Sequence, residues 1–111
     1  MNKKTCGLPE QITVGWRTYK IVSLDSAGKA EYAGQADITT GEIRLNPSLD
    51  PEILTNTVLH ETIHAIAQVW LESKQVPEST TSSLASGLQT VWRDNPKLIE
   101  WLNNNIKKLS Q

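Results

Sequence analysis

The sequence contains no phenylalanine and only one cysteine, Cys6, among its 111 residues. A single cysteine excludes an internal disulfide framework. No apolar run approaches the roughly 20 residues that a membrane-spanning helix needs. Residues 1–9 also lack the apolar segment of a signal peptide. We therefore expect a protein of the cytoplasm that is neither secreted nor embedded in a membrane.

The sequence also lacks an excess of either charge, with 11 basic and 12 acidic side chains and a net charge of −1. A nucleic-acid-binding protein usually shows a basic face or stripe, whereas here the basic pairs stand near the chain ends, at residues 3–4 and 107–108. We expect neither nucleic acid nor membrane as a partner. The length favours one domain over residues 1–111, with a core whose aromatic bulk is expected from Trp16, Trp70, Trp92 and Trp101.

The first half of the chain has the pattern of a small, mostly antiparallel sheet. Residues 11–24 are rich in β-branched and aromatic types, which predicts one long strand or a hairpin that turns near Gly15. After a turn signal at residues 25–28, short strands are predicted at Ala30–Ala33, Gln35–Ile38 and Glu42–Leu45, the last two joined by a hairpin loop at residues 39–41.

Three helices are predicted in the second half. Asp50 is a favourable N-cap residue and Pro51 fits the first helical position, so the first helix should run from there to about Ser73. The second should cover Glu78–Arg93 and the third Pro96–Leu109, after the break around Asn95. The expected fold class is therefore α+β, a small sheet followed by three helices.

The most specific motif is the pentad His60-Glu61-Thr62-Ile63-His64, which uses the only two histidines of the chain. Residues four apart on a helix lie on one face, one turn apart. Two imidazoles in this arrangement can bind one metal ion, and the glutamate after the first histidine can reach a water on that ion. His60 and His64 are thus predicted metal ligands, with Glu61 as a catalytic base.

A third ligand must be acidic or a cysteine, because no histidine remains. Glu78 is the first choice, since it begins the second helix after a short connection and shares a stripe with Thr81, Ala85, Leu88 and Trp92 that should face the core. Glu72, Asp94 and Cys6 stay open as alternatives.

These residues predict hydrolysis of a protein or peptide by a zinc-activated water. Zinc lowers the pKa of its water to about 7, and Glu61 would carry the proton to the leaving amine. Tyr19, Tyr32, Arg44 and Arg93 are candidates for stabilising the oxyanion. The strand Glu42–Leu45 directly precedes the motif helix and is expected to pair with an extended peptide.

Two simpler interpretations remain. The chain would be a zinc-stabilised module that binds a protein and cleaves nothing, or a domain without metal whose histidines are hydrogen-bonded in the core. The serine- and threonine-rich run at residues 79–83 is interpreted as a solvated helix face. The pattern specifies no oligomeric state.

Residues 34–45 and the helix segment Val58–Ile66 resemble small metallopeptidase-like proteins of phages and prophages, which are similar to minimal gluzincins and to ImmA/IrrE-like peptidases. The resemblance covers about residues 8–103, and Leu84–Leu88 and Arg93–Pro96 also resemble such proteins. It implies a zincin-like fold, His60, His64 and Glu78 as zinc ligands, Glu61 as base, and action in a host cytoplasm. SprT-like peptidases share the pentad but usually add a cysteine-rich zinc ribbon.

Overall fold

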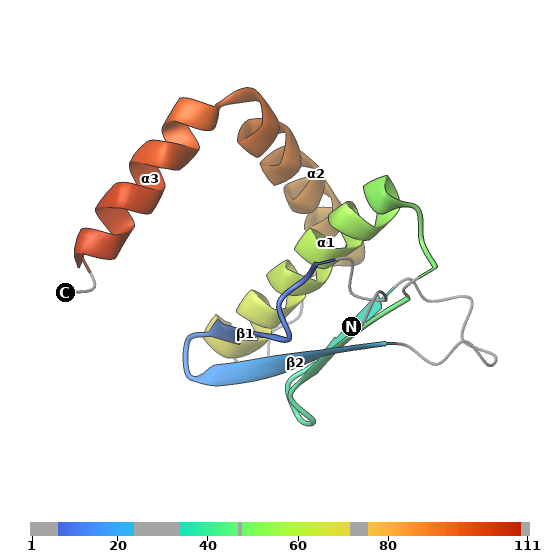
Figure 1. The fold of residues 1–111 in the computed structure, drawn as a ribbon. Coiled ribbons are helices and arrows are strands. Elements are labelled where there is room, and N and C mark those ends of the chain that lie inside the picture. Colours follow the sequence, from blue (N-terminus) through green and yellow to red (C-terminus); the bar gives the residue numbers. More distant parts are fainter. Residues whose placement is uncertain (1–6, 24–33, 47, 72–75, 110–111) are drawn as a thin grey trace.

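The computed structural model describes residues 7–23, 34–46, 48–71 and 76–109. It confirms an α+β fold of four strands followed by three helices (Figure 1). The predicted turn at residues 25–28 and the predicted strand Ala30–Ala33 lie outside the described residues. The elements in chain order are β1 (Gln11–Val14), β2 (Arg17–Ser23), β3 (Gly34–Asp37), β4 (Glu42–Leu45), α1 (Pro51–Trp70), α2 (Glu78–Asp94) and α3 (Pro96–Leu109).

The sheet consists of two hairpins, β1–β2 and β3–β4, joined side by side in the order β1-β2-β4-β3. Gly15 and Gly41 adopt φ of 59° and 71° in the two turns, a conformation that glycine reaches without steric cost. Both hairpins are antiparallel, but β2 and β4 pair in parallel, with Ile21 opposite Ile43. The sheet is therefore mixed, and its parallel pairing was not predicted.

The strand expected to receive a substrate peptide, Glu42–Leu45, is β4, and β4 is an inner strand. Its two edges are already paired, one with β2 and the other with β3. Ile43 and Leu45 point into the core and are buried. The expectation that this strand binds an extended peptide is thus wrong, because the second hairpin joins the sheet through β4 and leaves β3 at the edge.

The core lies between one face of the sheet and α1. Tyr19 of β2 is completely buried there, and its hydroxyl donates to Oε1 of Gln68 at 2.9 Å. The core residues are Val14, Tyr19, Ile43, Leu45, Leu54, Ala65 and Val69. The expectation that tryptophan fills the core is wrong, since each of the four is more than half exposed. They occupy a hairpin turn, the end of α1, and the two helices that do not cover the sheet.

The three helices match their predicted positions with small differences at the ends. The first ends at Trp70 and not near Ser73, and the second extends one residue further, to Asp94. Asp50 makes no capping hydrogen bond with its side chain; its carbonyl oxygen accepts the N–H of Leu54 at 2.7 Å. None of the helices among the described residues combines the length and the hydrophobicity of a membrane-spanning segment.

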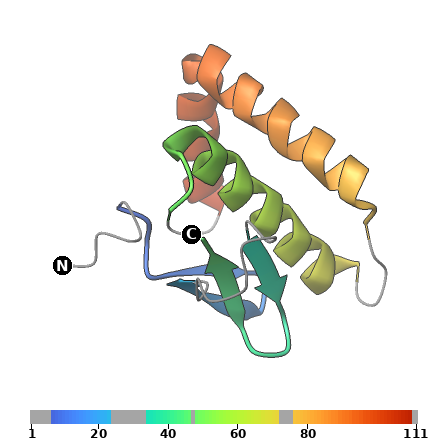
Figure 2. The ribbon, with the colours of Figure 1, turned by 90° about the vertical axis from the view of Figure 1, so that its right-hand side faces the viewer.

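The helix α2 runs antiparallel along α1, as Figure 2 shows. Asn56 near the start of α1 donates to Gln89 near the end of α2, whereas His64 lies beside Glu78 at the start of α2. Thr81 and Ala85 are fully buried at this contact, and their small side chains let the two helices approach closely. The third helix meets α2 near the break at Asn95 and stands off from the sheet.

Candidate metal centre

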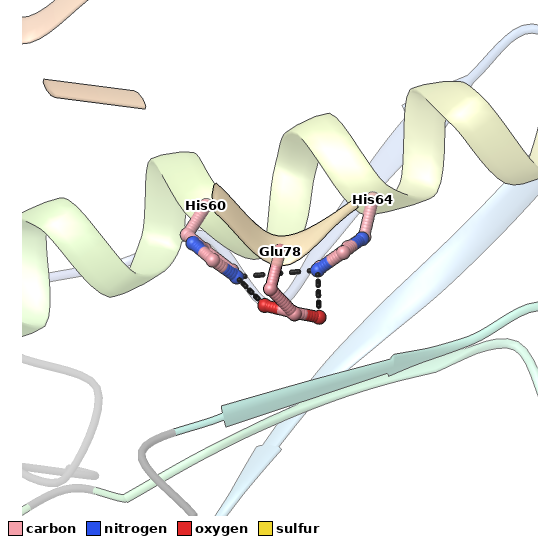
Figure 3. Close-up of side chains that lie close together, drawn as sticks. All are labelled: His60, His64 and Glu78. Carbon is pink, nitrogen blue, oxygen red and sulfur yellow. Dashed lines mark hydrogen bonds and ion pairs between the residues drawn. The ribbon is translucent and has the colours of Figure 1, made fainter. Parts of the chain in front are cut away.

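Two histidines of α1 and the first residue of α2 converge on one point (Figure 3). Nε2 of His60 lies 2.9 Å from Oε1 of Glu78, and Nε2 of His64 lies 3.0 Å from Oε2. The two Nε2 atoms are 3.2 Å apart. The three predicted ligands therefore form a group that could hold a metal ion.

The contacts within this group cannot all be hydrogen bonds. The carboxylate of Glu78 only accepts, so each Nε2 would have to carry a proton in order to bond it. Two protonated Nε2 atoms would then face each other at 3.2 Å with no acceptor between them. A cation in the centre removes the conflict, because both nitrogens and the carboxylate would present lone pairs to it.

The spacing also fits a small divalent ion. In a tetrahedral zinc site with bonds of about 2.0–2.1 Å, neighbouring ligand atoms lie roughly 3.3 Å apart. The observed separations of 2.9–3.2 Å require only small outward shifts. Two imidazoles and one carboxylate are a donor set typical of catalytic zinc.

Glu78 reaches the histidines from the rim of the site. Its side chain is 75% exposed, whereas those of His60 and His64 are 17% and 20% exposed. The predicted core-facing stripe is only half correct, because Leu88 and Trp92 are exposed. The helix α2 meets α1 through its small residues, Thr81 and Ala85, and the larger apolar side chains further along are left exposed.

Ser82, one turn after Glu78, lies on the same face of α2. Its Oγ is 3.5 Å from Nδ1 of His60. When Nε2 of a histidine binds a metal, the proton sits on Nδ1 and usually meets an acceptor that fixes the ring. The run at residues 79–83 is therefore more than a solvated face, since Thr81 is buried and Ser82 faces a ligand. The sequence could have indicated Ser82 in one way, because it lies four residues after Glu78 and therefore on the same face of the helix.

Glu61 lies on the side of α1 that faces β3, and it is 6% exposed. Burial raises the pKa of its carboxyl group, against the lowering effects of His64, His60 and a hydrogen bond from the backbone N–H of Ala36. A buried carboxyl group beside a ligand cluster, with a raised pKa, is typical of a group that accepts protons during catalysis.

Two side chains of α1 form hydrogen bonds with the backbone of Ala36, in the edge strand β3. Its N–H bonds Glu61, and its carbonyl oxygen accepts from Nε2 of Gln68 at 3.0 Å. Gln68 in turn accepts from Tyr19. Sequence reasoning missed Ala36 and Gln68; the one signal for Gln68 was its place seven residues after Glu61, on the same face of the helix.

Gly34 is needed where β3 approaches α1. A Cβ atom at this position would lie 2.9 Å from Cγ2 of Thr57 and 3.1 Å from Cγ of Glu61. Any larger residue would push the strand away from the helix. Glycine therefore lets β3 cover Glu61, a role that the sequence pattern did not indicate.

The other candidates for the third ligand and for the oxyanion group bind partners outside the ligand cluster. Asp94 binds Arg93 at 2.9 Å at the far end of α2. The hydroxyl of Tyr19 is bonded to Gln68, and Arg44 binds Glu42 and neighbouring polar groups on the sheet. The remaining alternatives, Cys6, Tyr32 and Glu72, lie outside the described residues. None of the described oxyanion candidates joins the ligand cluster.

Comparison of the chain with family models, with curated proteins and with solved structures finds no match. The possible metal centre therefore stands on the geometry of His60, His64 and Glu78 alone.

Proposed function

We propose that the chain is a zinc-dependent metallopeptidase with a zincin-like fold, in which His60, His64 and Glu78 bind the ion. The observation that carries the proposal is the three-way contact of two Nε2 atoms and a carboxylate. Hydrogen bonds alone would require a proton on both Nε2 atoms, which then face each other, whereas a bound cation requires a proton on neither. The resemblance to minimal gluzincins agrees with this ligand set.

Each residue of the pentad then has a distinct role. The two histidines use their Nε2 lone pairs, which requires both rings to be neutral, and Ser82 keeps the proton of His60 on Nδ1. Zinc, when bound by three protein ligands, leaves a position for water and lowers the pKa of that water to about 7.

Glu61 moves the proton in this mechanism. It takes a proton from the water that attacks the peptide carbonyl carbon, and it delivers that proton to the amine as the C–N bond breaks. The N–H of Ala36 holds its carboxylate, and the cover of β3 keeps bulk water away. Desolvation strengthens the carboxylate as a base.

The test is a set of variants assayed for zinc content and for hydrolysis of a mixture of internally quenched peptides. Glu61→Gln should bind zinc normally and lose about 10²–10⁴-fold in activity, the range for loss of a general base. Glu78→Ala should lose both zinc and activity. Glu52→Gln changes an exposed carboxylate of the same helix and should change neither. Wild-type protein that binds no zinc, or Glu61→Gln with full activity, would reject the proposal.

One observation favours a second candidate, a zinc-stabilised module that binds a protein without cleaving it. Tyr19, Arg44 and Arg93 all have partners away from the ligand cluster. None of these three side chains is therefore placed to stabilise an oxyanion on a substrate bound at the metal. In such a module the ion would cross-link α1 to α2. Full zinc binding with no hydrolysis, and Glu61→Gln indistinguishable from wild type in partner binding, would favour this candidate.

A further inference from the structure

Large apolar side chains are exposed along α2 and along the start of α3, and we refer to the two sets together as the α2–α3 stripe. On α2 the spacing is four, three and one residues, which keeps the side chains on one side of the helix. Their exposed fractions range from 40% to 61%. The residues of this α2–α3 stripe are Leu84, Leu88, Val91, Trp92, Leu98 and Trp101.

The α2 part of the stripe lies mostly to one side of the surface that faces α1. That surface carries Glu78, Thr81, Ser82, Ala85 and Gln89. At 100° per residue, Leu84 and Val91 lie about a third of a turn from its middle, and Leu88 and Trp92 lie within about a quarter turn of it. All four side chains are nevertheless 40–54% exposed, so α1 does not cover them.

The chain cannot cover the stripe by folding α3 back along α2. An antiparallel helix hairpin needs a loop of about 2–5 residues, but Asn95 alone separates the two helices. Its φ and ψ of −134° and 62° turn the chain sharply, and Pro96 keeps the preceding residue out of the helical conformation. The two helices stand apart as an open V, as Figure 1 shows.

The size of the stripe is that of a stable interface. Two tryptophans of up to 250 Å² each and four aliphatic side chains, all about half exposed, amount to roughly 600 Å² of apolar surface. A standard interface buries about 800 Å² per partner, of which somewhat over half is apolar. The stripe thus supplies the apolar part of one side of such an interface.

We propose that the stripe binds a second copy of the chain. The V presents two apolar helix faces, so α3 of each copy can lie on the α2–α3 stripe of the other, and one twofold axis covers both stripes at once. Such an isologous contact closes at two copies. A net charge of −1 per chain gives little repulsion between copies, and tryptophan is enriched at the centres of interfaces.

The proposal does not depend on the metal site, and its test is kept separate. Sedimentation velocity of the full chain, from micromolar to near-millimolar concentration, should show a species of twice the 12.3 kDa chain mass. Trp101→Glu should raise the dimer dissociation constant about 30-fold or more, as loss of a central interface residue does. Asn103→Glu places the same charge on the opposite side of α3 and should leave it unchanged.

Folding of the variants is measured by circular dichroism at dilute concentration. Trp101 is 61% exposed in the single chain, so its replacement should not unfold the protein. Leu88→Glu makes the same test on α2. A wild-type chain that stays monomeric, a series of larger polymers, or equal weakening by Asn103→Glu would overturn the proposal. A monomeric wild type would assign the stripe to a different protein.

Discussion

The two ends of α2 differ in which side chains are packed and which are exposed. At its start, polar and small residues pack against α1 and bring Glu78 to the histidines. At its end, the large apolar residues turn to solvent and continue onto α3. On α2, therefore, the buried residues are the small ones, Thr81 and Ala85, and the large apolar residues are exposed. The start of α2 and the part of α1 beside it, which we call the covered region, contain Glu61 and the metal ligands. The end of α2 and the start of α3, which we call the open region, have the composition of an interface.

The largest expected effect is the difference in cost between losing a buried and losing an exposed aromatic side chain. Tyr19→Ala should destabilise the fold by about 3–5 kcal/mol, because it leaves a cavity between the sheet and α1. Trp16→Ala, in the turn of the same hairpin, should cost about 1 kcal/mol at most, because the side chain is 72% exposed and the guanidinium of Arg17 lies 6.0 Å from its ring. Urea unfolding measures both. A similar loss for the two would mean that the tryptophan is not exposed.

The stabilising effect of zinc should depend on the residues at the start of α2 and on α1, and not on the exposed apolar side chains. At about 100 times its dissociation constant, zinc should raise the free energy of unfolding by about 2.7 kcal/mol. His64→Ala should abolish this increase, whereas Trp92→Ala on the open side of α2 should retain it. Unfolding curves with zinc and with a chelator give the measurement. A zinc effect that survives in His64→Ala would place the ion elsewhere.

A pair of glycine substitutions sharpens the same contrast. Gly34→Ala should destabilise the fold by about 1–3 kcal/mol, because the added methyl group meets Thr57 and Glu61. Gly87→Ala should instead stabilise it by about 0.5–1 kcal/mol, since no atom lies within 4 Å of the new Cβ and alanine favours a helix. Thermal unfolding compares the two variants. A stabilising Gly34→Ala would show that β3 does not press on Glu61.

The smallest expected effect concerns pH and Asp37, on the outer side of the sheet. Desolvation acts to raise its pKa, but the N–H groups of Thr40 and Thr39 and the guanidinium of Arg44 outweigh it and hold the pKa below its ordinary value. The carboxylate therefore stabilises the fold above the ordinary pKa of aspartate, and this contribution disappears as the pH falls through the lowered value.

Asp37→Asn should cost less than about 1 kcal/mol at neutral pH, as exposed ion pairs contribute little. It should also flatten the acid side of the stability curve. Asp50→Asn, whose side chain makes no capping bond, is the control and should follow the wild type. Denaturant unfolding at a series of acidic pH values compares the three proteins. An unchanged acid slope in Asp37→Asn would contradict the assignment.

Much of the local structure followed from the sequence. The third helix was predicted with its observed ends, and the turns at Gly15 and Gly41 appear where the pattern placed them. The pentad placed His60 and His64 one turn apart, and the short connection before α2 made Glu78 the first choice for a third ligand. Each of these predictions depends on residues close together in the chain.

Other features were missed or predicted wrongly because they depend on distant segments. No local pattern says that two hairpins join in parallel through β4, which turned a predicted substrate strand into an inner one. The cover of Glu61 by Gly34 and Ala36 requires β3 to lie against α1. The exposure of the tryptophans depends on which helices reach the sheet.

The sequence by itself determined the elements and the two histidines, because helix periodicity and turn chemistry act within a few residues. Only the tertiary structure decided which carboxylate completes the group, what buries Glu61, and which apolar face is left open. These outcomes depend on the packing of segments far apart in the chain, where small differences in side-chain size choose the contact.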